Sequence, residues 1–573
     1  MTPWQEQLAE RLKAARGEKP VDLLFRGAEV VNVFTGELVS VPVAVFDGVV
    51  VGFGERPAKE VVELDGAIVC PGFIDGHIHL ESSLLVPAEF ARAVLAQGTS
   101  TVVADPHEIA NVGGISGIQF MLEASEHIGL EVYFMAPSCV PATPLETAGA
   151  ELSGEDLASL AEHPTVLGLA EVMNFPGVVS GESSMLNKLE RFSGRVVDGH
   201  APGLGGSQLD AYLCARIGSD HECTHLAEAR EKLGKGMHIM VREGSQARDL
   251  EALVSLVTPR TAHRCMLVSD DCHPEDLLEH GHMNRILKRA MDLGMDPVTA
   301  IQLVTLNPAR YFGLRALGAV APGYQADMVV LRSLERLEIE RVYKRGKLVA
   351  VDGRVDELQI GTPEHMTFSR MNLQEVRTGD IRIHSESRRV RAMGIAPNTL
   401  VTTEEIVPVT ERQGEAVADP DRDLLKVAVI ERHRGTGRIG LGFVCGLGLR
   451  QGALASTVAH DSHNLLVIGA SDTDMVVAAN RLKDLGGGLV VVSGGQIRAE
   501  LPLPVAGLMS DVPLEHVVTQ KKQVDHAARA LGARLDQPFM AMSFLALPVI
   551  PRLKLTDRGL VDVERFCYMA LFV

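Results

Sequence analysis

The sequence lacks paired cysteines, long apolar runs and a signal segment. Its eight cysteines are spread over 573 residues without a CxxC pair, which argues against a disulfide framework and favours reduced thiols. No apolar run reaches the length of about 18 residues that a membrane helix requires. The first twenty residues are charged and helical in pattern and lack the apolar segment of a signal peptide. We therefore expect a cytoplasmic protein that is not inserted in a membrane.

An excess of basic residues is also missing. The formal net charge of -19 argues against a nucleic-acid or anionic-membrane partner, because both require a basic face. The sequence has no GxSxG elbow and no PCxxC segment, so a serine hydrolase and a cytidine-deaminase zinc site are not indicated. What is present, 46% hydrophobic and 23% charged residues, is typical of a compact globular protein. A small-molecule substrate fits these properties.

The chain is too long for a single hydrophobic core, so several domains are expected. From Ile68 onward, short apolar strands alternate with helical stretches, and about eight such units over roughly 250 residues predict a (β/α)8 TIM-type barrel. Strand-rich segments on both sides of it predict a small β-sandwich, and a separate α/β unit follows. The expected ranges are an N-terminal helix in 1–20, the β-sandwich in 21–69 plus 317–400, the barrel in 70–316 and the C-terminal α/β domain in 401–573.

The strongest chemical signal is His77-Ile78-His79 at the end of the first barrel strand. Alternate residues of a strand face the same side, so the two imidazoles can bind one metal ion. An isolated HxH pattern is weak, but its position matters because barrel enzymes carry their chemistry at the carboxyl ends of the strands. We interpret this pair as the start of a metal site.

Later strand ends supply further ligands of the same kind. Glu171 ends an apolar strand, where an unpaired charge would be costly, and it can bridge two metals. The set of predicted ligands is completed by His200, His221 and Asp270. Together, four imidazoles and two carboxylates are enough for a dinuclear site that binds Zn, Mn or Fe. Two neighbours remain alternatives: His225 for His221, and Asp271 for Asp270.

The segment Asp105-Pro106-His107-Glu108 follows the second predicted barrel strand. Pro106 favours a rigid turn, after which three ionisable side chains point toward the barrel mouth. The simpler interpretation is a helix N-cap at Asp105 with solvated neighbours. The functional interpretation is that this segment binds the substrate or transfers a proton.

Several motifs resemble those of a known family. IVCPGFIDGHIHLESS and APGYQADMVVL resemble the amidohydrolase superfamily, which pairs a metal-binding barrel with a small β-sandwich. ADPHEIANVGG, DGHAPGL, SDHECT and SDDCHPEDLLEHGHMNRI are similar to bacterial adenine deaminases. The C-terminal segments HDSHNLLVIGASDTDM and FLALPVIPRLKLTDRGLVD extend the resemblance over nearly the whole chain, from about Val21 to Val573.

The resemblance implies that adenine and water are converted to hypoxanthine and ammonia, a reaction of purine salvage. It implies two divalent ions, Mn or Fe in preference to Zn, held by the six ligands named above, with Glu171 in the bridging place. A homodimer or a higher homo-oligomer is expected. One residue departs from the pattern: Cys272 stands where many members are expected to have Arg or Lys, which bears on substrate orientation.

A mechanism can be assembled from these residues. We expect hydroxide formed at the metals to attack C6 of adenine, and Asp270 to carry its proton to the amino group. A donor is needed for N1 of the ring, and Glu108, His107 and Glu222 are the candidates. Asp105 and Asp271 are the candidates for binding the purine edge.

Two other functions compete with this one. The first is a related metal hydrolase that opens a cyclic amide. Two features argue against it: the C-terminal segments, and Glu171 at the bridging place that a carboxylated lysine fills in many relatives. The second is a binding protein built on an inactive barrel, which should have lost one or more ligands.

Overall fold

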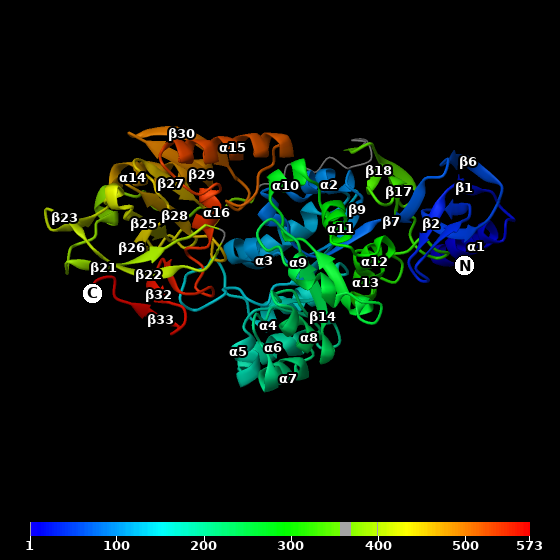
Figure 1. The fold of residues 1–573 in the computed structure, drawn as a ribbon, viewed down its shortest axis with the longest axis horizontal. Coiled ribbons are helices and arrows are strands. Elements are labelled where there is room, and N and C mark those ends of the chain that lie inside the picture. The colour runs from blue at the N-terminus through cyan, green and yellow to red at the C-terminus, as the bar shows by residue number, and fades with distance from the viewer. Residues whose placement is uncertain (1, 356–367, 398) are drawn as a thin grey trace.

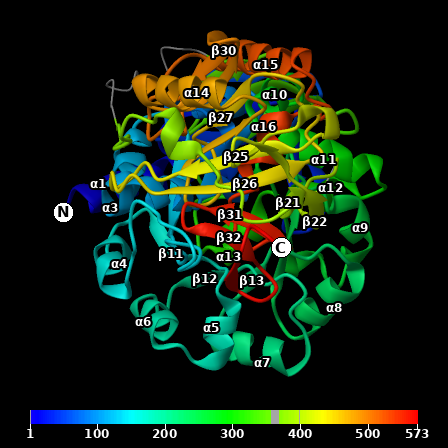
Figure 2. The same cartoon turned by 90° about the vertical axis from the view of Figure 1, so that its left-hand side faces the viewer.

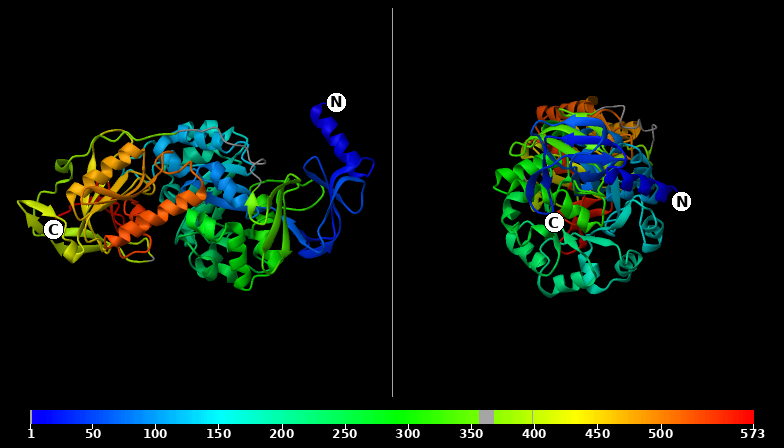
Figure 3. Two further views of the ribbon diagram at one scale, coloured as in Figure 1. Left: turned by 90° about the horizontal axis from the view of Figure 1, so that it is seen from above. Right: turned by 90° about the vertical axis from the view of Figure 1, so that its right-hand side faces the viewer.

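A computed structural model describes residues 2–355, 368–397 and 399–573. A central barrel region lies between flanking β-sheets on one side and a C-terminal unit on the other (Figure 1). Helix α1 (Pro3–Ala15) projects at the end far from the C-terminus (Figure 3). Within the described ranges, no helix combines the length and the apolar character needed to cross a membrane.

The central region is an α/β unit whose parallel strands curl into a barrel. Hydrogen-bonded strands follow the order β12-β11-β10-β9-β8-β16, with a second run β13-β14-β15. The short strand β16 continues β15 and pairs with β8, which brings the last strand against the first. The strands are β8 (Phe73–His79), β9 (Thr99–Ala104), β10 (Glu131–Ala136), β11 (Val166–Val172), β12 (Val196–Gly199), β13 (Ser219–Asp220), β14 (His238–Arg242), β15 (Cys265–Val268) and β16 (Asp270–Asp271).

Helices cover the outside of these strands, so strands such as β9 are buried along their entire length and read as apolar, β-branched runs. Helix α3 contains a kink at Gly114, whose φ of 58° lies outside the helical region. The helices are α2 (Pro87–Leu95), α3 (His107–Ala124), α4 (Gly154–Ala161), α5 (Phe175–Ser180), α6 (Ser183–Arg191), α7 (Gly206–Cys214), α8 (Leu226–Gly234), α9 (Leu250–Leu253), α10 (Pro274–Glu279), α11 (Met283–Asp292), α12 (Pro297–Leu303) and α13 (Leu306–Tyr311).

The flanking region consists of two sheets that share one apolar core. Phe25 and Val43 from one sheet pack with Val69 and Met328 from the other. The order β5-β4-β1-β6 is formed by β1 (Val21–Arg26), β4 (Val43–Phe46), β5 (Val49–Phe53) and β6 (Ala58–Glu63). The order β20-β19-β18-β17-β7-β2-β3 is formed by β2 (Glu29–Asn32), β3 (Glu37–Ser40), β7 (Ile68–Pro71), β17 (Met328–Ser333), β18 (Glu338–Lys344), β19 (Lys347–Val351) and β20 (Arg354–Val355).

The pairing of β7 with β17 joins chain segments from before and after the barrel. The two segments run antiparallel, with Met328 opposite Pro71. The small domain therefore draws strands from both flanks of the barrel sequence. Of the range expected for it, residues 356–367 and 398 lie outside the described part of the chain.

The C-terminal unit is built on an eight-stranded sheet in the order β22-β21-β26-β25-β28-β27-β29-β30. Helices α14 (Asp472–Leu485) and α15 (Leu514–Ala530) pack against it, and α16 (Pro538–Ser543) follows. The strands of this sheet are β21 (Arg389–Gly394), β22 (Thr403–Pro408), β25 (Leu425–Ile430), β26 (Ile439–Cys445), β27 (Ala453–Ser456), β28 (Leu465–Gly469), β29 (Gly488–Ser493) and β30 (Gln496–Pro502). Smaller strands are β23 (Thr410–Arg412), β24 (Glu415–Val417), β31 (Leu553–Thr556), β32 (Gly559–Asp562) and β33 (Cys567–Met569).

Two features of this unit differ from the sequence-based expectation. Its sheet is mostly antiparallel rather than the parallel sheet of an α/β domain, because hairpins join strands such as β29 and β30. Strand β21, which the boundary at residue 400 placed in the small sandwich, pairs with β22 and β26 of the C-terminal sheet. In Figure 2 this sheet lies in front of the barrel, and Thr147 and Asp557 are hydrogen-bonded across the junction.

Candidate active site

The six predicted metal ligands lie together at one rim of the barrel. They are His77 and His79 in β8, Glu171 in β11, His200 after β12, His221 after β13 and Asp270 in β16. The carboxyl ends of parallel strands meet at one rim of a barrel, and strand pairing places Asp270 opposite Ile78, between the two histidines of β8. Residues far apart in the sequence are therefore neighbours here.

Glu171 lies at the centre of this cluster. Its Oε2 is 2.7 Å from Nδ1 of His200 and 3.0 Å from Nε2 of His221. Its Oε1 is 3.5 Å from Nε2 of His79. One carboxylate thus reaches imidazoles from three other strands, as a ligand shared by two metal ions must.

Asp270 contacts the two histidines of β8. Its Oδ1 is 3.4 Å from Nε2 of His77 and 3.2 Å from Nε2 of His79. Burial alone would raise the pKa of Asp270, but the adjacent imidazoles of His77 and His79 and the charge of Arg242 hold it well below its usual value. Its φ of 62° is left-handed, a conformation that non-glycine residues adopt rarely and often at functional sites. Asp270 is therefore a carboxylate available as a base.

Two imidazole nitrogens test whether this cluster fits a metal. Nε2 of His77 and Nδ1 of His221 are buried, and no described residue gives them a hydrogen-bond partner. The groups His77–His79–Asp270 and His77–Glu171–His221 each offer donor atoms within 4.8 Å of one another. Buried polar atoms without partners are uncommon, and nitrogen and carboxylate donors suit Zn, Mn and Fe. The donor set fits a metal centre.

The Asp105–His107 segment borders the cluster. Nδ1 of His107 is 3.1 Å from Oδ2 of Asp105 and 3.3 Å from Oε1 of Glu171. The backbone carbonyl of Asp105 is 3.1 Å from Nδ1 of His79. If Nδ1 of His79 donates to that carbonyl, its Nε2 is left with a lone pair for a metal, which is the usual arrangement around histidine ligands.

Arg242, at the end of β14, was not identified from the sequence. Its guanidinium contacts Oε1 of Glu222, and its Nη1 lies 3.3 Å from Oδ2 of Asp270. Its Nη2 is 3.1 Å from Asp249. The available signal was a polar residue at the end of the apolar strand MHIMVRE. Glu222 is consequently an ion-pair partner of Arg242, and its carboxylate also lies 3.6 Å from His200.

Residues 459–464 of the C-terminal unit, here called the His460 loop, reach the barrel at Glu108. Oε1 of Glu108 is 2.5 Å from Nδ1 of His460, and Oε2 is hydrogen-bonded to Nε2 of His463. Nδ1 of His463 accepts the backbone N–H of Ala459 at 3.1 Å, so the proton of this ring lies on Nε2 and points at Glu108. His463 therefore acts as a hydrogen-bond donor, which argues against a metal between these side chains.

These contacts bear on the role expected of Glu108 as a proton donor to N1. Burial alone would raise its pKa, but His460, His463 and His107 hold it well below its usual value. Glu108 is therefore an ionised carboxylate with both of its oxygens engaged by imidazoles. The HDSHN motif supplies both histidines of this contact, but its residue pattern does not indicate which part of the barrel it meets.

Comparison with known proteins places this arrangement in a family. The amidohydrolase family pattern matches residues 68–349, and the adenine deaminase C-terminal domain matches residues 399–567. An adenine deaminase from Desulfatibacillum aliphaticivorans is 48% identical over 98% of this chain and 99% of its own length. The chain belongs to the adenine deaminase family.

Other members of the adenine deaminase family match over similar lengths. The protein of that name from Syntrophobacter fumaroxidans is 50% identical and covers 99% of this chain and 98% of its own. The one from Methanothrix thermoacetophila is 46% identical, covering 99% of this chain and 100% of its own. The family resemblance expected from the motifs is thereby confirmed.

In this member of the adenine deaminase family, the two alternative ligands, His225 and Asp271, are not part of the cluster. His225 is exposed at the start of α8, whereas His221 is buried in the cluster. Oδ1 of Asp271 accepts a hydrogen bond from Ser82 at 2.5 Å. Cys272 is fully buried in the hydrophobic core, where burial raises the pKa of its thiol to about 12.

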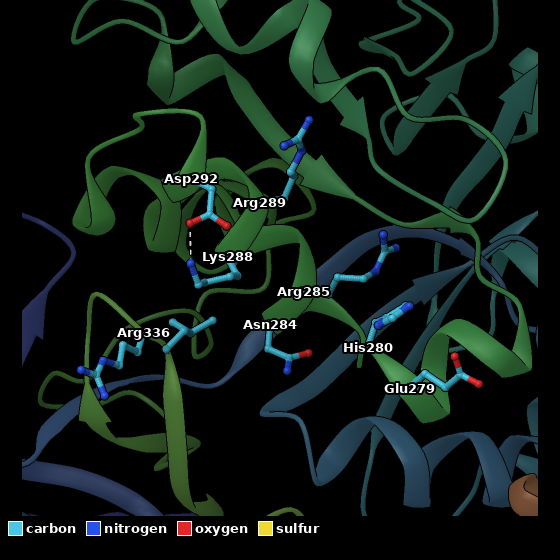
Figure 4. Close-up of a pocket in the computed structure, with 9 residues that line it drawn as sticks. Glu279, His280, Asn284, Arg285, Lys288, Arg289, Asp292 and Arg336 are labelled. Carbon is cyan, nitrogen blue, oxygen red and sulfur yellow. Dashed lines mark hydrogen bonds and ion pairs between the residues drawn. The ribbon is translucent and has the colours of Figure 1, made fainter.

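A surface hollow of about 430 Å³ lies apart from this cluster, along α11 (Figure 4). Its cations have partners: Lys288 pairs with Asp292, and Arg289 with Glu251 at 2.6 Å. None of the six clustered ligands lines the hollow. It therefore carries no part of the site.

Proposed function

We propose that this chain is a metal-dependent hydrolase that converts adenine to hypoxanthine and ammonia. The observation that carries the proposal is the convergence of four imidazoles and two carboxylates at one barrel rim. The full-length similarity to proteins named adenine deaminase supplies the substrate. Purine salvage is the process such a reaction serves.

The residues proposed to hold two divalent ions are the six clustered side chains. Glu171 would be the ligand shared by the two ions, because one of its oxygens lies near His79 and the other near His200 and His221. Mn or Fe is proposed in preference to Zn. When bound, such ions supply the Lewis acidity that makes water a nucleophile at neutral pH.

Asp270 is proposed to move the proton that this reaction must transfer. It accepts a proton from the water that attacks C6 and delivers it to the exocyclic nitrogen, so that ammonia leaves rather than an amide ion. Arg242 holds the second oxygen of Asp270 and compensates its charge. Glu222 completes this network by binding Arg242.

The substrate region is proposed to border Asp105 and His107. These side chains are buried, bonded to each other and adjacent to Glu171. Their position beside the cluster is suited to orienting a flat ring over it. Asp271 is directed to Ser82 instead, so we no longer assign it to the purine.

The test is ammonia release by the Mn-loaded protein. Adenine should be the preferred substrate over adenosine, 6-methylaminopurine and dihydrouracil, and chelation of the metal should abolish turnover. Mn content of about two ions per chain is expected. Turnover of dihydrouracil without turnover of adenine would contradict the proposal and favour a cyclic-amide hydrolase.

A further inference from the structure

The reaction proposed above needs a proton donor for the ring, and the three candidates named from the sequence are engaged by other side chains of the barrel or of the C-terminal unit. Both oxygens of Glu108 are engaged by imidazoles, and Glu222 is paired with Arg242. His107 lies between Asp105, Glu108 and Glu171. Another carboxyl group lies in the His460 loop, the segment of the C-terminal unit that contacts Glu108.

The His460 loop is held firmly on the barrel. Besides the contacts to Glu108, Nδ2 of Asn464 donates to the carbonyl of Thr147 at 2.8 Å. The buried guanidinium of Arg432 donates to the carbonyls of His463 and, at 2.9 Å, Ala506. Fixed hydrogen bonds thus hold both ends of the segment between His460 and Asn464.

Asp461 is the residue of this loop that these contacts leave unexplained. Its side chain is buried, with 5% of its surface exposed, and among residues 2–355, 368–397 and 399–573 none bonds to its Oδ2. The charged groups close enough to affect it are His107, Glu108, His460 and Glu171. A buried carboxyl group normally has a hydrogen-bond partner, so an unpaired carboxyl oxygen near these charged groups indicates a ligand.

The surroundings of Asp461 make it easier to protonate than an ordinary aspartate. Burial is the largest cause and raises its pKa to about 6, with opposing effects from His107 and Glu108. Glu146, in the loop after β10, faces Asp461 and is also buried, and burial together with the charge of Asp461 raises the pKa of Glu146 well above its usual value. A carboxylic acid in this setting can both donate and accept a hydrogen bond.

We propose that Asp461, contributed by the C-terminal unit, is the catalytic residue that binds the purine ring at N1 and protonates it. This inference rests on the proposed adenine deamination. As the water oxygen bonds to C6, the O–H of Asp461 transfers its proton to N1, and Asp270 transfers the first water proton to the amino group. The C6–N bond then breaks, ammonia leaves, and the remaining hydroxyl proton returns to Asp461 as the C6 carbonyl forms.

The proposal makes the positions of His460 and His463 understandable. They do not touch the substrate themselves. They are positioning residues that hold the loop on Glu108, and with it the neighbouring Asp461. The C-terminal unit would thereby complete the active site.

The test uses the full-length Mn-loaded protein and the isosteric variant Asp461→Asn. Its kcat for adenine should fall about 100-fold, because an amide cannot give up a proton. A tenfold fall is the smallest change that supports the proposal. Inhibition by hypoxanthine, which already carries a proton on N1, should stay within threefold, because the amide oxygen still accepts that N–H. Metal content and Tm should equal those of the wild type.

Glu146→Gln is the matched control, since Glu146 is a buried acid beside Asp461, and its kcat should stay within threefold. A fall of less than tenfold in Asp461→Asn, or an equal loss of hypoxanthine binding, would overturn the proposal. If Asp461→Asn does not fold, Asp461→Ser is measured under the same criteria. A wild-type protein that releases no ammonia from adenine would instead refute the proposed function, and this inference with it.

Discussion

The two β-rich regions meet opposite ends of the same barrel strands. The flanking sheets bind where strands begin: Lys344 donates to the carbonyl of Ser100 near the start of β9, and Arg345 pairs at 2.7 Å with Glu131, the first residue of β10. The C-terminal unit binds where strands end, through His460 and Glu108, just beyond β9.

This difference separates contacts that stabilise from contacts that act on the reaction. Barrel enzymes carry their chemistry at the carboxyl ends of the strands, whereas the amino ends serve stability. Both regions use ion pairs to join the barrel, so the kind of interaction does not distinguish them. Their position along the strand does.

The largest effect is expected at the centre of the carboxyl rim. Asp270→Asn should keep most of the metal but lower kcat about 1000-fold or more, ~4 kcal/mol, because the amide cannot accept the proton of the attacking water. Steady-state kinetics with metal analysis measures this. Near-normal turnover would exclude Asp270 as the proton carrier.

A matched pair of substitutions compares the two ends directly. Glu108→Gln should lower kcat/KM about 100-fold, ~3 kcal/mol, because the His460 loop loses its charge-assisted hydrogen bonds. Glu131→Gln removes an equivalent carboxylate at the amino end and should leave kcat/KM within twofold. Equal losses in both variants would remove the distinction between the two regions.

The amino end is expected to affect stability instead. Lys344→Met leaves the buried carboxylate of Asp327, 2.6 Å from the amine in the wild type, without its cation. The free energy of unfolding should fall by about 3 kcal/mol, while kcat of the folded protein stays within twofold. Urea unfolding measures the change, and the double variant Lys344→Met/Asp327→Asn should recover part of it.

The smallest effect concerns pH. Burial lowers the pKa of His460, but the charge of Glu108 outweighs it and raises the pKa to about 9. A group whose pKa is raised by folding stabilises the folded protein at pH values below its unfolded pKa of about 6.5. This stabilisation is lost as the pH rises through 9. Tm should therefore fall between pH 7 and pH 9.5, and fall less in Glu108→Gln. An equal fall in both proteins would contradict this.

Sequence patterns predicted those parts of the site that the barrel repeats produce. His77, Glu171 and Asp270 each end or follow an apolar strand, and the rule that strand ends meet is enough to bring them together. Arg242 obeys the same rule but is not a typical metal ligand, so it was not singled out.

Contacts between domains did not follow from these patterns. The position of the His460 loop on Glu108 depends on how two separately folded regions dock. The alternation of strands and helices along the sequence does not predict which surfaces of the two regions meet. The same limit explains β21, whose parallel partner β26 lies about fifty residues later and whose own sequence reads like an ordinary strand of the sandwich.

The pairing of β7 with β17 has a consequence for how the chain is made. The whole barrel sequence lies between these strands, so at ribosomal rates of about 5–20 residues per second β7 waits roughly tens of seconds for its neighbour. During that time its edge is open to other chains. The barrel can fold first, and the small domain is completed only after β17 has been translated.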